Sequence, residues 1–206
     1  MSFLVMIANG PVSSFLPIII AGFGFNRLNS LLLVMPAGVI IGSITLIVTY
    51  LAYRVPGIRT WTMVGCQCGT ILASFLLWKL PQSSKGGLPF ACYIFSTFGG
   101  SYAVIMGLQV ANTTGYTKRS ITSPGVFVGY CIGPLLFKPK DAPVYAPGFT
   151  AVLGTSVATA VLAIVYRDVC IWENQRRDKS GTLEGFDHAH EDDLTDLKNP
   201  QFRYTL

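Results

Sequence analysis

The apolar positions of this chain gather into six long runs, at about residues 3–21, 31–52, 60–78, 89–108, 121–137 and 149–166. None of the six carries an Asp, Glu, His or Arg in its middle. A helix rises about 1.5 Å per residue, so roughly 20 apolar residues are needed to cross about 30 Å of hydrocarbon. The alternation typical of strands is absent from all six runs. The pattern therefore predicts membrane-spanning helices, because lipid offers exposed backbone polar groups no partner.

The composition supports this prediction. The mean hydropathy is +0.51, and charged residues make up 12% of the chain, about half of the roughly 25% usual in soluble domains. The fold class we expect is all-α, a polytopic membrane bundle with six transmembrane helices in residues 1–166. Residues 167–206 carry most of the acidic side chains, and we expect them to form a cytoplasmic, largely disordered tail.

Charge is divided unevenly along the chain. Residues 1–166 hold nine Lys or Arg against the single acid Asp141, whereas residues 167–206 hold six against nine acids. If the tail is cytoplasmic, the basic residues near span ends favour the inner side, so we expect both termini in the cytoplasm. The inner set is Arg54, Arg59, Lys118, Arg119, Arg167, Arg176, Arg177 and Lys179, and the outer set is Arg27, Lys79, Lys85, Lys138 and Lys140. The net charge of +5 reflects these loops and does not indicate a nucleic-acid partner.

Residues with catalytic or metal-binding chemistry are few. The five cysteines are odd in number and lie in or beside the runs, so we expect buried free thiols rather than a disulfide framework. His188 and His190 stand beside acids, but a solvated acidic tail is the simpler interpretation. The membrane part shows no nucleophile–base pair, phosphate-binding loop or carboxylate dyad. We therefore expect no catalytic residues, no metal and no cofactor; an integral membrane enzyme that uses the tail's His and acids is kept as an alternative.

Small residues repeat every four positions in two of the runs. This spacing places bare backbone on one helix face, where a neighbouring helix can approach closely. The repeats are Gly65 and Gly69 in the third run and Gly125, Gly129 and Gly133 in the fifth. Static packing is one interpretation; the other is a helix that rocks or bends during transport, helped by Pro124 and Pro134 at the ends of the same segment.

Polar side chains inside hydrocarbon are costly, so each must face another helix or a wet cavity. As a set, they suggest a polar seam through the bundle. Each of these side chains has two interpretations: a hydrogen bond to a neighbouring helix, or contact with a ligand. The candidates we select near mid-depth for a substrate path are Asn9, Ser101, Tyr102 and Tyr130.

The segment NTTGYTKRS at residues 112–120 resembles a loop with the pattern NxxGxTKRS in fungal major facilitator transporters of the anion:cation symporter group. That group includes allantoate, nicotinate and pantothenate permeases. Further segments that resemble this group follow in the family's order: GFGF at 22–25, LLVMPAG at 32–38, GYC at 129–131, DAPVY at 141–145, ENQRRD at 173–178, DLTD at 193–196 and NPQFRY at 199–204.

The resemblance covers only the carboxyl-terminal half of such a transporter. It implies a six-helix half-bundle in residues 1–166, a plasma-membrane location and a small organic anion or vitamin as substrate. It also implies that a missing amino-terminal half, or a second copy, completes the transporter. The loop residues it singles out are Asn112, Gly115, Lys118 and Arg119. The chain departs from the pattern at Tyr116, where relatives carry His, and in a fifth span that is about one turn short. A non-transporting membrane fragment or interaction protein from a truncated transporter gene is the alternative.

Overall fold

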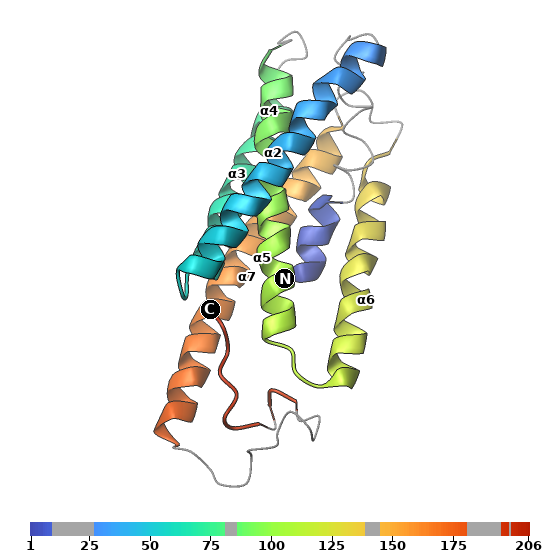
Figure 1. Ribbon diagram of the computed structural model, residues 1–206. Helices are drawn as coiled ribbons and strands as arrows, with labels where there is room; N and C mark the ends of the chain where they lie inside the picture. The colour runs from blue at the N-terminus through green and yellow to red at the C-terminus, as the bar shows by residue number, and fades with distance from the viewer. Residues whose placement is uncertain (10–26, 81–85, 139–144, 181–194, 198) are drawn as a thin grey trace.

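A computed structural model describes residues 1–9, 27–80, 86–138, 145–180, 195–197 and 199–206. Throughout these residues the chain is helical or irregular, with no strand, and Figure 1 shows the helices as one elongated bundle. Residues 2–9 form a first short helix. It is followed by α2 (Arg27–Arg54), α3 (Arg59–Lys79), α4 (Gly87–Phe95), α5 (Phe98–Ala111), α6 (Tyr116–Ile132), the 3₁₀ turn η1 (Gly133–Leu136) and α7 (Ala146–Lys179). The expected all-α fold is confirmed for the described residues.

Four helical segments are long and apolar enough to cross a membrane: Leu32–Arg54, Arg59–Lys79, Gly87–Ala111 and Ala146–Lys179. Six spans were expected, so two are missing from the described residues. Most of the run at 3–21 lies outside them. The run at 121–137 is interrupted, because α6 has 17 residues and gives way to η1, with Pro134 in its first turn. A proline has no N–H to continue the α-helical ladder, so the α-helix ends there.

The run at 89–108, expected as one helix, is divided into α4 and α5 at Ser96 and Thr97. The backbone tightens across this break: the Thr97 N–H donates to the Ile94 carbonyl at 3.0 Å, and the Gly100 N–H donates to the Thr97 carbonyl at 3.1 Å. These are i to i−3 bonds, which replace the usual i to i−4 pattern. The Ser96 hydroxyl donates to the Cys92 carbonyl at 3.3 Å. Local side-chain bonds of this kind offer the backbone an alternative to the regular helix.

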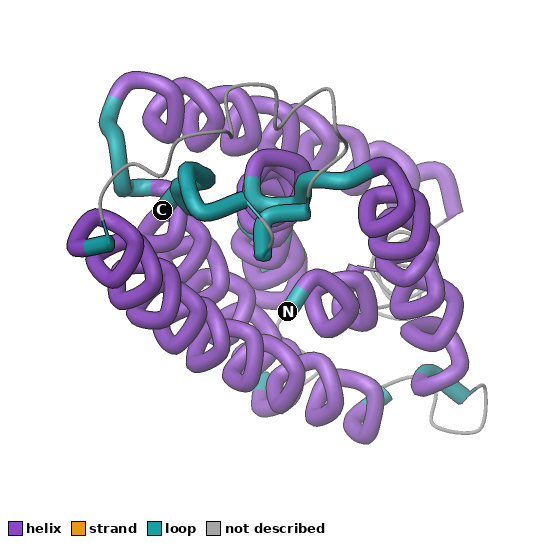
Figure 2. The backbone as a smooth tube through the Cα atoms, turned by 90° about the horizontal axis from the view of Figure 1, so that it is seen from below, coloured by secondary structure: helices purple, strands orange, loops and turns teal. Residues whose placement is uncertain are grey.

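α3 packs against α4, α5 and α7, while α2 crosses α5. Figure 2 shows the helices end-on, with the first short helix inside the ring that the others form. One apolar core lies where Leu77, Leu88 and Phe149 meet, and a second one includes Met63, Ile105 and Leu108. Outside these cores, α2 keeps a long apolar face exposed, which includes Leu28, Leu32, Met35, Val39, Leu46 and Ile47.

The carboxyl-terminal part differs from the expected tail. α7 runs for 34 residues to Lys179, well past residue 166, and its last turn carries Arg176, Arg177 and Lys179, whose charges favour a helix C-terminus. Residues 199–206 return along the bundle and bond to it; the Asn174 side chain, for example, donates to the Tyr204 carbonyl at 2.8 Å. Of the expected tail, residues 167–179 thus belong to α7, and residues 199–206 are bonded to it. Residues 181–194, with His188 and His190, lie outside the described residues.

Several polar groups meet at one end of the bundle. The Arg167 side chain of α7 donates to the Gly57 carbonyl, in the turn between α2 and α3, at 2.6 Å. The turn between α5 and α6 and the chain's end lie toward the same end in Figure 1. Arg54, at the end of α2, donates to the Tyr50 hydroxyl at 3.0 Å. The cytoplasmic orientation of this end remains a prediction from the charge bias.

Candidate functional site

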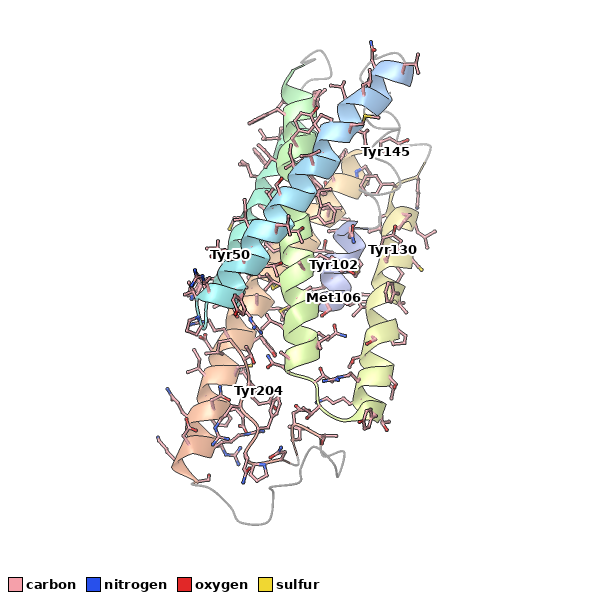
Figure 3. All side chains as sticks on the ribbon, viewed as in Figure 1. Tyr50, Tyr102, Met106, Tyr130, Tyr145 and Tyr204 are labelled. Atoms are coloured by element: carbon pink, nitrogen blue, oxygen red, sulfur yellow. The ribbon has the colours of Figure 1, made fainter. Side chains whose placement is uncertain are left out.

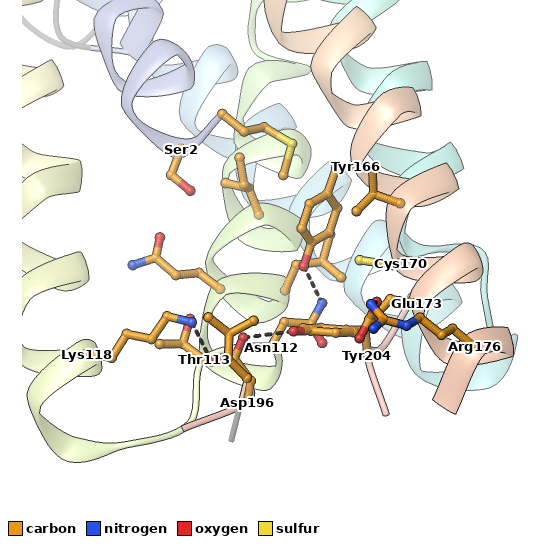
Figure 4. A pocket seen from close by; sticks show the side chains of 16 residues that line it. Ser2, Asn112, Thr113, Lys118, Tyr166, Cys170, Glu173, Arg176, Asp196 and Tyr204 are labelled. Atoms are coloured by element: carbon orange, nitrogen blue, oxygen red, sulfur yellow. Dashed lines mark hydrogen bonds and ion pairs between the residues drawn. The ribbon is translucent and has the colours of Figure 1, made fainter. Parts of the chain in front are cut away.

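A pocket of about 560 Å³ opens at this end between α5 and α7 (Figure 4). Its size falls within the roughly 300–1,000 Å³ common for small-molecule sites. Helix α5 contributes Gln109 and Asn112, and α7 contributes Tyr166 and Cys170. The remaining wall comes from elsewhere in the chain, with Met1, Ser2, Lys118, Asp196 and Tyr204 among its residues. Residues far apart in sequence therefore meet around one cavity.

Asn112, the first residue of the loop motif, joins three segments. It is buried at the end of α5. Its amide nitrogen donates to the Tyr166 hydroxyl at 2.6 Å and to the Thr205 carbonyl at 2.8 Å. The Thr205 N–H donates in return to its amide oxygen at 2.7 Å. In this reciprocal pair the Asn112 side chain both donates to and accepts from the backbone of Thr205, as a neighbouring β-strand would.

Lys118, in the first turn of α6, forms an ion pair with Asp196. Asp196 is only 4% exposed, and its second oxygen accepts a hydrogen bond from the Tyr204 hydroxyl at 2.9 Å. Both oxygens of the carboxylate thus have a partner, as a buried charge requires. Burial, and then the hydrogen bond to Asp196, raises the pKa of Tyr204 to about 12, so its hydroxyl stays protonated and able to donate.

Gly115 and Arg119 complete the loop motif. Gly115 has a φ of 93°, in the region that residues with a Cβ rarely adopt, so a glycine is needed at the start of α6. The Arg119 guanidinium donates to the Thr113 carbonyl at 3.2 Å and to the Val110 carbonyl at 3.3 Å. These bonds satisfy carbonyls near the end of α5, which have no partner within the helix. The motif therefore stabilises a turn and holds the end of the chain.

Two further residues hold the end of the chain, and neither was expected from the sequence to be a site residue. Arg177 is 8% exposed, and its guanidinium donates to Glu173 at 2.9 Å and to the Phe202 carbonyl at 2.9 Å. It also lies 5.0 Å from the centre of the Tyr204 ring. Asn174 bonds the Tyr204 backbone reciprocally, both distances being 2.8 Å. The resemblance had flagged both segments, ENQRRD and NPQFRY, without indicating that they meet.

The four residues selected for a substrate path do not line this pocket as the described residues form it. Ser101 is fully buried and accepts a hydrogen bond from the Gln67 amide at 3.0 Å, which joins α5 to α3. Asn9 is half-buried, and its amide contacts the Met6 sulfur at 3.8 Å. Tyr102 and Tyr130 are half-buried on α5 and α6, as Figure 3 shows. The structure thus places Ser101 in a helix interface.

Some of the repeated glycines lie against a neighbouring helix, and others have open space beside them. A Cβ at Gly69 would lie 2.6 Å from the Thr97 hydroxyl, and a Cβ at Gly129 would meet the Phe3 carbonyl and lie 3.0 Å from the Met6 Cβ. At Gly65 and Gly125 the same atom would have nothing within 4 Å. Gly133 is buried in η1. Close approaches that the spacing did not predict occur at Gly99, Gly100 and Gly148.

The thiols differ in part from the expectation of buried cysteines. Cys66, Cys92 and Cys170 are buried, whereas Cys68 and Cys131 are exposed. Cys66 and Cys68 are two positions apart on α3, so a helix directs them to different faces. Within the described ranges no group of three His, Cys, Asp or Glu side chains could hold a metal ion.

The four helical segments long and apolar enough to cross a membrane indicate a polytopic membrane protein. The chain is 33% identical to the uncharacterised transporter C757.13 of Schizosaccharomyces pombe over 97% of its own length and 40% of that relative. It is 33% identical to the thiamine pathway transporter THI73 of Saccharomyces cerevisiae, over 96% of this chain and 38% of the relative. It is 30% identical to the allantoate permease of the same yeast, over 97% of this chain and 40% of the relative.

The chain is therefore homologous to one part of fungal transporters of the major facilitator type, and these relatives are transporters rather than enzymes. It spans about two fifths of the length of the curated relatives it matches. No family model matches the chain, and no solved structure matches it.

Proposed function

We propose that the chain is the carboxyl-terminal, six-helix half of a major facilitator symporter, which moves a small organic anion or vitamin together with an amino-terminal half. The observation that carries this proposal is the extent of the match. Three transporters at 30–33% identity align with 96–97% of the chain, but only with 38–40% of their own length. Alternating access in transporters of this kind works between two structural repeats around a site near the bilayer midplane.

The exposed apolar surface of α2 supports the proposal of a partner within the membrane. α2 is the most exposed of the apolar helices; Leu32 is 60% exposed and Met35 is 68% exposed. Some of this face meets lipid, and a second half or a second copy would cover the rest. The relatives' names supply the substrate class: one is an allantoate permease and one a thiamine pathway transporter. The specific substrate of this chain is not fixed by its fold.

Topology is part of the same proposal. The runs at 3–21 and 121–137 also cross the membrane, and both termini lie on the cytoplasmic side of the plasma membrane. The charge bias supports this, and so does the position of Lys118 and Arg119 at the same end of the bundle as the chain's end. Reporter fusions at Met1 and Leu206 should label on the same side. Labels on opposite sides would contradict the count of six spans.

For the substrate path we keep Asn9, Tyr102 and Tyr130 as direct contacts, and Ser101 as a member of the same seam. Tyr102 and Tyr130 lie on α5 and α6, on either side of the first short helix in Figure 3. Their hydroxyls are hydrogen-bond donors of the kind that fixes a small polar ligand in an otherwise apolar site. With one half alone, such a site would have a single wall.

A second candidate is a membrane fragment or interaction protein that does not transport. The same coverage of about 40% of the relatives favours it. The two candidates differ in whether adding an amino-terminal half restores uptake.

The test expresses the chain in yeast cells alone, and with the amino-terminal half of the allantoate permease or of C757.13. Uptake of labelled allantoate and of a panel of small organic anions is then compared. We expect uptake only in cells with both halves, reduced strongly by Tyr130→Ala and also by Tyr130→Phe, which keeps the ring but removes the hydroxyl. No uptake with either added half would favour the fragment.

A further inference from the structure

We infer that the end of the chain is a releasable strap that ties the cytoplasmic ends of α5, α6 and α7 together and shields the pocket between α5 and α7. The carboxyl-terminal strap is defined here as residues 195–197 and 199–206. This inference does not depend on which substrate is carried. The loop motif at residues 112–120 and the terminal motifs at 193–196 and 199–204 would then share one role, since Lys118 contacts Asp196 and Asn112 contacts Thr205, directly after the second terminal motif.

The strap is held through its backbone by two asparagines on different helices. Asn112 of α5 forms a reciprocal pair with Thr205, and Asn174 of α7 forms one with Tyr204. The pairs span 93 and 30 positions in sequence. Amide side chains that bond both the N–H and the C=O of a segment bind it in the manner of an added strand. The two helices are therefore bridged by adjacent residues of the strap.

An ion pair extends this bridge to α6. Lys118 pairs with Asp196, which is 4% exposed and also accepts from Tyr204. Elsewhere, α6 meets the first short helix at Gly129. Removing Lys118 would leave the buried carboxylate of Asp196 charged and without a cation or water to stabilise it, which strongly destabilises the packed arrangement. Losing the Lys118–Asp196 pair is therefore the step that frees the strap from α6.

A thiol in the wall of the pocket can report release of the strap. Cys170 lines the pocket from α7 and is 3% exposed, and Tyr204 of the strap lines the same pocket (Figure 4). Cys92 of α4 is 1% exposed and does not line the pocket. A reagent that reaches Cys170 but not Cys92 therefore measures opening of the strap, and labelling of both measures unfolding.

The experiment treats the whole chain in lipid nanodiscs with a negatively charged methanethiosulfonate and measures modification at each cysteine by peptide mass spectrometry. We expect Cys170 to be protected in the unmodified chain. Lys118→Glu or Asp196→Lys alone should make its labelling at least about tenfold faster, as expected for a local opening. The double variant, which reverses the pair, should restore protection. Hydrogen exchange in the first turn of α6 should rise and fall with the same variants.

Two milder variants keep the test decisive if the charge reversals unfold the chain. Asp196→Asn removes the buried ion pair, whereas Asp178→Asn removes the Asp178–Arg203 pair of the same strap, whose acid is 65% exposed. The first should expose Cys170 and the second should have little effect, since exposed pairs contribute little. The inference is overturned if Cys170 of the unmodified chain labels as fast as it does in Asp196→Asn. Equal labelling in Asp196→Asn and Asp178→Asn would overturn it as well.

Discussion

Gly129 offers a sharp test of how the first short helix is held. A methyl group there would meet the Phe3 carbonyl oxygen and lie 3.0 Å from the Met6 Cβ. Both neighbours belong to the short helix, and a backbone carbonyl cannot rotate away as a side chain can. The helix must therefore shift as a body, and overpacking of this kind costs about 1–3 kcal/mol.

Gly125 provides the matched control. It lies one turn earlier on α6, and a Cβ there would have nothing within 4 Å. Gly125→Ala should be neutral or stabilise the helix by up to about 1 kcal/mol, because alanine loses less backbone entropy. The two substitutions add the same atom to the same helix, so any difference between them reports on the contact with Phe3.

The assay is thermal unfolding of the detergent-solubilised chain, followed by size-exclusion chromatography after heating. In a domain of this size, 1 kcal/mol shifts the midpoint by roughly 2–4 °C. We expect Gly129→Ala to lower the midpoint by several degrees, and Gly125→Ala to leave it unchanged or raise it. Equal midpoints for the two variants would refute the packing of the short helix against α6.

Two further predictions concern α5. Gly100→Ala should destabilise the chain by about 1–3 kcal/mol, because its Cβ would lie 2.8 Å from the Cys66 sulfur. Gly107→Ala is the control, since a Cβ there would have nothing within 4 Å. The same unfolding assay checks both variants, and a Gly100→Ala chain as stable as the unmodified one would contradict the α3–α5 contact. Ser101→Ala leaves the buried Gln67 amide without its acceptor and should cost about 1–3 kcal/mol. A double change with Gln67→Leu should recover most of that loss, and additive losses would show that the bond is absent.

The sequence predicted the helices α2 and α3 well, because their apolar runs are uninterrupted and end at charged residues, Arg54 and Lys79. It did not predict the break at Ser96 and Thr97. Small polar residues are compatible with a regular helix, and the break depends on side-chain bonds such as that from Thr97 to the Cys66 carbonyl of α3, at 3.2 Å. A contact between two helices leaves no periodic signal in either one.

The end of the chain shows a second limit. The acid-rich, polar composition of residues 167–206 predicts disorder, but the contacts at the end of the chain are made by a few residues whose partners lie far away in sequence. Asn112 and Thr205 illustrate this at a separation of 93 positions. Local composition carries no information about such a pair. The resemblance to transporters included both the loop motif and the terminal motif, but it gave no physical reason for them. The structure supplies the reason, because the two motifs bind each other.

The central claim is that this chain is one half of a transporter and needs the other. The most direct measurement reconstitutes the purified chain in liposomes, alone and with a purified amino-terminal half, and follows uptake of a labelled organic anion under a proton gradient. The account predicts saturable uptake only when both halves are present. Saturable, proton-dependent uptake by the chain alone, abolished by Tyr130→Ala, would contradict it.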